Sequence, residues 1–294
     1  SLYALMSIGL VVAGRWVVAN WRSLINIRAR RISHFKLLSP LGKGGMGEVY
    51  KALDLNTREF VAIKLLHPEI MKDTQNRKRL TNEGRLLASF SHPNVVRVFE
   101  LGETGREMFI AMEYLSGGTL QEFLEKNHPI EPARLLVLLR EIAGGLAAIH
   151  REKIVHRDLK PGNLMLDEQG QVRIMDFGLS KSPLVTTMTS LGTVLGTLGY
   201  VAPEQITGAG VDHRVDIFSF GVVMFVMATN KAPFSGENEM ALIHAIFNYT
   251  PPDVRDIRTD LPEGYSEMVR RCLQKDPADR YPDMAAILGA LETL

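Results

Sequence analysis

Two neighbouring stretches decide the fold of this chain. The first reads Ile154-Val155-His156-Arg157-Asp158-Leu159-Lys160-Pro161-Gly162-Asn163-Leu164, and the second reads Ile174-Met175-Asp176-Phe177-Gly178. Together they bring two carboxylates, an ammonium and a carboxamide into a short span. Carboxylate and amide oxygens are the hard ligands that Mg²⁺ prefers. A single aspartate in such a stretch can equally be a turn cap, so the other motifs of the chain must decide between the two interpretations.

A glycine-rich loop lies upstream, between two strand-like runs. It reads Leu41-Gly42-Lys43-Gly44-Gly45-Met46-Gly47-Glu48-Val49, a G-x-G-x-x-G pattern. Glycines let backbone N–H groups approach phosphate oxygens, because no Cβ stands in the way. Alone the pattern is weak, since many such runs are ordinary turns. The chain continues as the strand-like run 49–52 instead of a helix, which excludes a dinucleotide-binding loop.

A lysine ends the apolar run Val61-Ala62-Ile63-Lys64. An ammonium at the end of such a strand can hold the α- and β-phosphates of a nucleotide, whereas the plain alternative is a solvated lysine. Glu83 lies on a helix predicted for residues 72–90, and its carboxylate could hold the Lys64 ammonium in place. Glu83 could instead be a surface residue.

The order of these motifs resembles the Hanks-type protein kinases, especially their bacterial serine/threonine members. The resemblance covers about residues 34–292 and includes Ala202-Pro203-Glu204. It implies an α+β, bilobal protein kinase fold. The small β-rich N-lobe with one main helix would span 34–112, the hinge 113–118, and the larger, mainly α-helical C-lobe 119–294.

The residue pattern agrees with that layout. Residues 34–66 and the runs Val95–Gly102 and Met108–Tyr114 favour strands. Beyond Gly118 the chain is mostly helical, with helices expected over 119–127, 131–151, 215–229, 238–248 and 265–274.

The resemblance assigns catalytic roles. Asp158 would orient the acceptor hydroxyl and take its proton, and Lys160 would reach the γ-phosphate. Asn163 and Asp176 would hold Mg²⁺, with Mn²⁺ as an alternative ion. Lys160 is typical of the serine/threonine kinases, and Thr197 matches the family threonine that faces Asp158 and Lys160. The implied reaction is transfer of the γ-phosphate of Mg·ATP to Ser and Thr hydroxyls of protein substrates.

The resemblance also implies how the nucleotide is bound. Met112 would be the gatekeeper, and Glu113 and Leu115 would offer backbone groups to adenine. The remaining residues of this set are Leu41, Gly42, Gly44, Gly47, Val49, Ala62 and Lys64. Gly118-Thr119 departs from relatives that contact ribose through an acidic residue, so the ribose contact has no assigned residue.

Three further positions match structural residues of the family. Glu204, at the end of the activation segment, would pair with Arg280 and support the substrate platform. Asp216 would anchor the catalytic loop, and it could at the same time be a plain helix N-cap. Leu87, Val98, His156 and Phe177 would form a hydrophobic column.

Arg157 suggests regulation by phosphorylation. In relatives this arginine binds a phosphate on the activation loop, and a phosphate there could order that loop. The candidate autophosphorylation sites are Thr186, Thr187, Thr189, Ser190 and Thr193, with Thr187 or Thr189 favoured. The plain alternative is that these hydroxyls only fill a polar loop.

Composition sets limits on partners. The chain has 294 residues with 34 basic and 33 acidic side chains, so its balanced charge predicts no nucleic-acid partner. Cys272 is the only cysteine, which excludes an internal disulfide and fits a reducing cytoplasm; we expect it to be a buried apolar residue. Relatives often activate as lobe-to-lobe dimers, so a homodimer is also expected.

The first 33 residues differ from the rest. The run 2–14 is almost wholly apolar, and Trp16, Trp21 and several arginines follow it. This pattern predicts the C-terminal part of a transmembrane anchor with a basic juxtamembrane segment on the cytoplasmic side. The kinase domain would then be cytoplasmic and held at the cell membrane. A soluble amphipathic leader and a signal peptide are the alternatives.

Two functions other than a serine/threonine protein kinase are alternatives. A nucleotide-binding pseudokinase scaffold would be favoured by loss of Lys64, Asp158 or Asp176, and all three are present. A small-molecule kinase of similar fold is disfavoured by the peptide platform that Thr197 and Glu204 imply.

Overall fold

The structure, a computed structural model, describes residues 30–44, 47–67, 88–105, 107–176 and 197–294. The chain divides into two compact units. The first consists of Ser1–Phe90 and Arg97–Tyr114, and the second of Ser91–Val96 and Leu115–Leu294.

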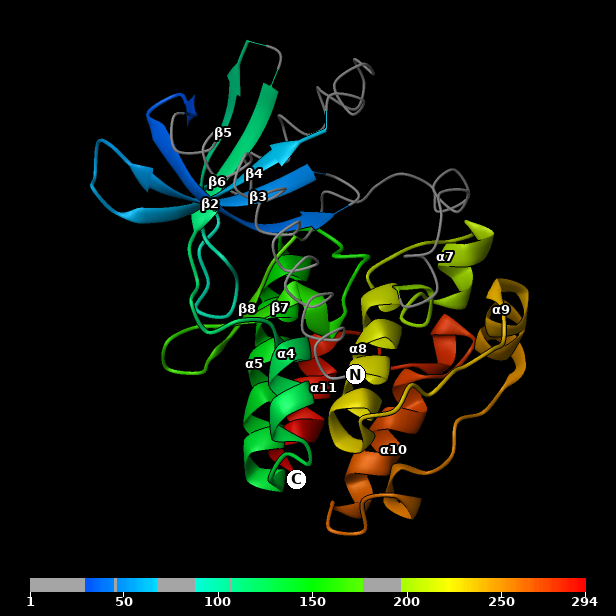
Figure 1. Cartoon of the computed structure of the whole chain (residues 1–294). Helices are drawn as coiled ribbons and strands as arrows, with labels where there is room; N and C mark the ends of the chain where they lie inside the picture. The colour runs from blue at the N-terminus through cyan, green and yellow to red at the C-terminus, as the bar shows by residue number, and fades with distance from the viewer. Residues whose placement is uncertain (1–29, 45–46, 68–87, 106, 177–196) are drawn as a thin grey trace, which may run out of the picture. The chain divides into compact units, whose positions relative to one another are not determined.

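The first unit is built on a six-stranded antiparallel sheet in the order β1-β2-β3-β4-β6-β5 (Figure 1). Its strands are β1 (Arg31–Ile32), β2 (Phe35–Gly44), β3 (Gly47–Asp54), β4 (Phe60–Leu66), β5 (Val98–Thr104) and β6 (Glu107–Glu113). The predicted strands are confirmed, although β5 begins three residues later than the apolar run suggested. Val95 instead forms an isolated bridge with Ile174 in the second unit.

A hydrophobic cluster of the first unit gathers on one face of this sheet. Phe35 and Phe109 meet edge to face with their ring centroids 5.7 Å apart. Ile32 of the short strand β1 is only 2% exposed and belongs to the same cluster. Two register shifts interrupt the pairing of β2 with β3, between Leu37 and Ser39 and between Pro40 and Gly42.

The second unit is mainly helical (Figure 1). Its α-helices are α4 (Leu120–Asn127), α5 (Pro132–Arg151), α7 (Pro203–Thr207), α8 (Arg214–Thr229), α9 (Glu239–Asn248), α10 (Glu263–Cys272) and α11 (Met284–Glu292). Short 3₁₀ helices occupy Pro161–Asn163 (η1), Val254–Asp256 (η3) and Pro277–Asp279 (η4), and β7 (Leu164–Leu166) pairs with β8 (Val172–Ile174).

Helix α8 forms the centre of this unit. All of its residues after Arg214 are buried, which is typical of a helix that is apolar on every side. Helices α5 and α10 pack against α8, and α11 packs against α5. The five helices expected from the sequence are confirmed within two residues at each end.

Cys272, the last residue of α10, is fully buried, as expected of an apolar core residue. Burial raises the pKa of its thiol to about 12. The described residues include no helix that is both long and apolar enough to cross a membrane.

Candidate active site

The loop between α5 and β7 brings together three of the residues expected to be catalytic. The Lys160 ammonium donates to both carboxylate oxygens of Asp158, with Nζ–Oδ1 and Nζ–Oδ2 distances of 3.0 and 2.9 Å. The Asn163 amide nitrogen donates to the Asp158 carbonyl at 2.7 Å and to its Oδ2 atom at 2.8 Å. Asp158 therefore has a fixed orientation, and the Asn163 amide oxygen points away from the carboxylate.

Thr197 joins this group from a distant part of the chain. Its Oγ1 atom lies 3.3 Å from Lys160 Nζ. Thr197 is the first described residue after the segment 177–196. The Lys160 ammonium thus connects the carboxylate of Asp158 to a hydroxyl that follows this segment.

His156 fixes the backbone of the loop. Its Nε2–H donates to the Met175 carbonyl at 2.9 Å, while its Nδ1 atom accepts from the Asp158 N–H at 3.2 Å. The ring is therefore the neutral tautomer with the proton on Nε2. Since Met175 N–H also donates to the Asn163 carbonyl at 3.0 Å, residue 175 is tied twice to the loop. Asp176 follows directly, with a left-handed φ of 60°.

Asp216 is the buried anchor beneath the loop. Its Oδ2 and Oδ1 atoms accept the backbone N–H groups of His156 and Arg157, each at 2.8 Å, and Oδ2 also accepts from His150 Nε2 at 2.8 Å. Burial alone would raise the pKa of Asp216, but the His150 hydrogen bond, the nearby imidazoles and the Arg157 N–H outweigh it and lower that pKa. The N-cap of α8 is His213, so an N-cap role for Asp216 is wrong.

Arg157 adopts a left-handed backbone conformation, with φ of 67°. Its carbonyl accepts from Gln205 Nε2 at 3.1 Å, which ties the loop to α7. Its buried Nε atom has no hydrogen-bond partner within the described part of the chain. The candidate phosphorylation sites Thr186, Thr187, Thr189, Ser190 and Thr193 lie outside the described residues.

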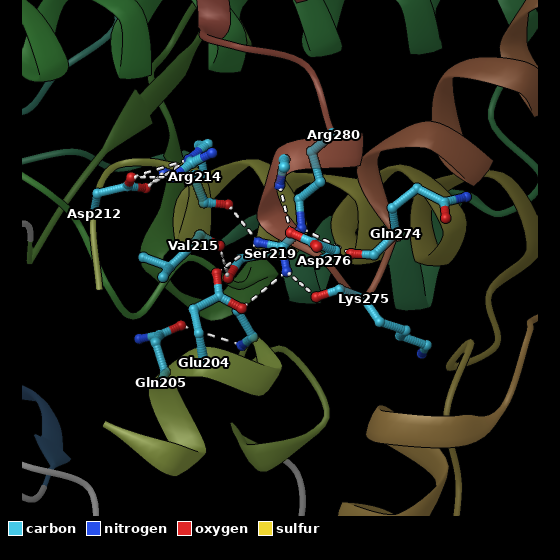
Figure 2. A network of polar contacts seen from close by, with 12 residues as sticks. Glu204, Gln205, Asp212, Arg214, Val215, Ser219, Gln274, Lys275, Asp276 and Arg280 are labelled. Carbon is cyan, nitrogen blue, oxygen red and sulfur yellow. Dashed lines mark hydrogen bonds and ion pairs between the residues drawn. The ribbon is translucent and has the colours of Figure 1, made fainter. Parts of the chain in front are cut away.

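Glu204 and Arg280 form a buried, bidentate ion pair (Figure 2). The two N–O distances are 2.6 and 2.8 Å. Arg280 also donates to three backbone carbonyls, those of Arg214, Gln274 and Lys275, at 2.8 to 3.1 Å. The pair therefore connects α7 to the first residue of α8 and to the chain after α10.

Two aromatic rings lie beside the cations of this network. The Arg280 guanidinium lies 5.0 Å from the centroid of the Phe218 ring, and Lys275 Nζ lies 4.1 Å from that of Phe234. Burial and the charge of Arg280 lower the pKa of Lys275 to about 8. Since Lys275 Nζ also donates to the Ile246 carbonyl, the network reaches α9.

In the first unit, the register of the sheet aligns residues expected to bind the nucleotide. Lys64 lies opposite Val49 of β3 and Ile110 of β6, and Ala62 lies opposite Met112. Lys64 is only 5% exposed. Glu83, the partner expected for Lys64, lies outside the described residues, as do Leu87 and Phe177 of the expected column.

The glycines of the β2–β3 loop differ in their surroundings. A Cβ on Gly47 would lie 1.9 Å from the Leu65 carbonyl oxygen, so the approach of β4 requires glycine there. A Cβ on Gly42 or Gly44 would meet no described atom within 4 Å. Among Gly42, Gly44 and Gly47, packing against described residues therefore accounts for the need for glycine only at Gly47. Leu41, at the start of this loop, is 47% exposed.

The segment that joins the two units is held at both ends. Glu113 N–H donates to the Arg97 carbonyl at 2.9 Å, and Arg97 N–H donates to the Glu113 carboxylate at 3.3 Å. Beyond Leu115, Gly117 N–H donates to the Leu166 carbonyl at 3.1 Å.

The donor chemistry at the loop fits a divalent cation. Asn163 and Asp176 would supply an amide oxygen and a carboxylate, both hard ligands. Within the described ranges no cluster of three or more His, Cys, Asp or Glu side chains could hold a metal by itself.

Sequence reasoning missed two residues of this network. His150 supports Asp216 from α5, and Gln205 joins α7 to the loop. Neither belongs to a motif that we had identified. Only the close approach of segments far apart in the chain reveals them.

Comparisons with known proteins identify the family. The protein kinase domain pattern matches residues 35–289. The chain is 33% identical over 262 residues to serine/threonine-protein kinase PknL of Mycobacterium tuberculosis, covering 89% of this chain and 66% of that protein. It is 33% identical over 253 residues to serine/threonine-protein kinase PrkC of Bacillus subtilis, covering 86% of this chain and 39% of that protein.

A solved structure shows the same fold. The kinase domain of PknI from Mycobacterium tuberculosis superposes with a TM-score of 0.71 at 24% identity, covering 90% of this chain and 98% of that one. The expected α+β protein kinase fold is therefore confirmed, whereas the chain spans less than two thirds of the first curated relatives it matches. This chain belongs to the protein kinase family, as a catalytic domain of the Hanks type found in bacterial serine/threonine kinases.

Proposed function

We propose that the chain transfers the γ-phosphate of Mg·ATP to serine and threonine hydroxyls of protein substrates. The observation that carries the proposal is the cluster of Asp158, Lys160, Asn163 and Thr197. Phosphoryl transfer has a loose transition state, so positioning and charge neutralisation provide most of the catalysis. This cluster offers one base, one cation and an oriented amide for those tasks.

Each residue has a defined task in this reaction. Asp158 orients the acceptor hydroxyl and takes its proton, and the two hydrogen bonds from Asn163 hold the aspartate in place. Lys160 leaves its contact with Asp158 to neutralise charge on the γ-phosphate. Lys64 holds the α- and β-phosphates, with Glu83 as its partner.

Asn163 and Asp176 hold the metal ion, which is Mg²⁺ or Mn²⁺. When bound, the ion neutralises charge on the phosphates. The adenine-binding set is Met112, Glu113 and Leu115 with Leu41, Val49 and Ala62, and the backbone of Gly42, Gly44 and Gly47 lies along the phosphates.

Regulation is part of the proposal. A phosphate on Thr187 or Thr189 would supply a charged partner for Arg157, whose buried Nε atom has none within the described residues. Mass mapping after incubation with ATP tests this point. A map with no phosphate between Ser180 and Thr193 would refute regulation by phosphorylation of this loop.

The N-terminal segment supports a location at the cell membrane. Its apolar run and arginines favour anchorage, with the kinase domain on the cytoplasmic side. A homodimer is proposed separately, by analogy with the lobe-to-lobe dimers of relatives. Vesicle flotation of the full chain tests the anchorage, and analytical ultracentrifugation tests the dimer.

The decisive experiment follows radiolabelled γ-phosphate from ATP to a generic basic protein. We expect label on serine and threonine, and a loss of about 100-fold or more in Asp158→Asn. Asp256→Asn, an exposed aspartate of η3, is the matched control and should keep wild-type activity. A wild-type chain that binds ATP but transfers nothing would favour the pseudokinase scaffold and overturn the proposal.

A further inference from the structure

Lys51 of β3 lies between two aromatic rings of the first unit. Its Nζ atom is 4.2 Å from the centroid of the Phe60 ring and 4.3 Å from the centroid of the Tyr114 ring. Phe60 begins β4 and is 55% exposed, while Tyr114 directly follows β6. A cation between two rings is attracted by both ring faces. The contact therefore joins β3 and β4 to the residue that follows β6.

The register places this cluster on the same face of the sheet as the nucleotide-binding residues. Lys51 lies opposite Ala62, and Ala62 lies opposite Met112. Because side chains alternate along a strand, Phe60 shares the face of Ala62 and Lys64 on β4. Lys51 reaches Phe60 across a diagonal, which suits a long side chain.

Tyr114 connects this cluster to the adenine-binding segment. It stands between Glu113 and Leu115, the two residues whose backbone groups are proposed to contact adenine. Glu113 is already tied to Arg97 by two hydrogen bonds. The Lys51 contact fixes the next side chain along the chain, at the last residue of the first unit.

We propose that Lys51 is a positioning residue that sets nucleotide affinity and base selectivity. It holds Tyr114 against the sheet, and this fixes the backbone on either side of Tyr114 for adenine. The inference rests on the proposed function, since it assumes that this segment binds the base. Lys51 acts through Tyr114 and not on the phosphates, so the chemical step should not depend on it.

The test compares Lys51→Met with the wild-type chain. We expect the KM and the Kd for ATP to rise by about 3- to 10-fold, since two partly exposed cation–π contacts are lost. The preference for ATP over GTP should fall, while kcat stays within about two-fold. Lys51→Arg should restore ATP affinity and selectivity, because a guanidinium also stacks on aromatic rings.

The controls separate positioning from general stability. Lys126→Met removes an exposed lysine of α4 and should leave the Kd for ATP unchanged. Phe60→Leu removes one ring and keeps the contact between Lys51 and Tyr114, so the Kd for ATP should rise less than in Lys51→Met. Wild-type ATP affinity and base preference in Lys51→Met would overturn the inference, and so would an Lys51→Arg variant as weak as Lys51→Met.

Failure of the inference is distinguishable from failure of the proposed function. The Kd for ATP is measured by calorimetry and needs no phosphate transfer. A wild-type chain that binds ATP without transferring phosphate would overturn the proposed function, and the Kd values of the variants would still decide the role of Lys51.

Discussion

Arg280 and Glu204, 76 residues apart in the chain, join through two parallel hydrogen bonds in the interior of the second unit (Figure 2). All five N–H groups of the Arg280 guanidinium have an acceptor, either Glu204 or a backbone carbonyl. The Arg280 side chain is 0% exposed and that of Glu204 is 9% exposed, so both charges are desolvated and depend on each other. A lysine could not replace this planar set of donors.

Breaking this pair should destabilise the chain strongly. Arg280→Met leaves the Glu204 carboxylate buried without a cation, and removing one partner of a buried pair costs about 3–5 kcal/mol. The free energy of unfolding in urea measures the effect. Arg270→Met is the matched control, because its ion pair with Glu267 is exposed and should matter little. Equal losses in both variants would contradict the argument.

Asp216 should make stability sensitive to acid. Its folded-state pKa is lowered, so it lies below the unfolded value of about 3.9. The unfolded state then binds more protons, and this stabilisation is present above about pH 4 and is lost as the pH falls further, through the folded-state pKa. Asp216→Asn should lack this part of the acid dependence in urea titrations between about pH 2 and 6.

Asp216→Asn should also have a lower kcat than the wild type. The N–H groups of His156 and Arg157 would lose their charged acceptor, so we expect kcat to fall by about ten-fold or more. Asp212→Asn is the comparison, since that aspartate pairs only with its neighbour Arg214 among the described residues. An unchanged kcat in Asp216→Asn would refute the anchoring role.

The loop glycines should respond differently to alanine. Gly47→Ala places a Cβ 1.9 Å from the Leu65 carbonyl and should lower the melting temperature. A Cβ at Gly42 or Gly44 would meet no described atom within 4 Å. Gly42→Ala and Gly44→Ala should therefore keep the wild-type melting temperature, while the KM for ATP rises. Thermal unfolding and steady-state kinetics separate the two effects. A wild-type KM in both Gly42→Ala and Gly44→Ala would mean that these glycines do not serve the nucleotide.

The hydroxyl of Thr197 should affect turnover. Thr197→Val removes the oxygen 3.3 Å from Lys160 Nζ, and loss of such a hydrogen bond should lower kcat by about 5- to 10-fold. Thr197→Ser keeps the hydroxyl and should retain most of the activity. A peptide phosphorylation assay with saturating ATP gives the comparison, and equal rates in Thr197→Val and wild type would remove Thr197 from the site.

Much of this structure could be predicted from the sequence, because each catalytic motif and each helix is encoded within one short stretch of the chain. The stretch from His156 to Asn163 holds its reacting groups together within one loop. Helix α8 was expected over 215–229 and spans Arg214–Thr229, since its long apolar run ends at Asn230 in a left-handed conformation. Such signals need no knowledge of distant segments.

Other features depend on contacts that sequence spacing does not encode. Helix α11 was missed, although Asp283 before its apolar run is an N-cap signal that could have indicated it. His150 contributes only because α5 brings it 2.8 Å from Asp216, 66 residues later in the chain. The two-residue strand β1 is too short to recognise from its pattern, and only its pairing with β2 defines it.

The burial of Cys272 gives the chain a practical property. Its thiol is the only one in the sequence, it is fully buried, and it ionises only in strong alkali, so reagents that attack thiolates should not modify the native protein. A cysteine introduced at the surface could therefore carry a fluorophore or spin label without removal of the natural one. Modification of Cys272 itself would report that helix α10 has come away from the protein interior.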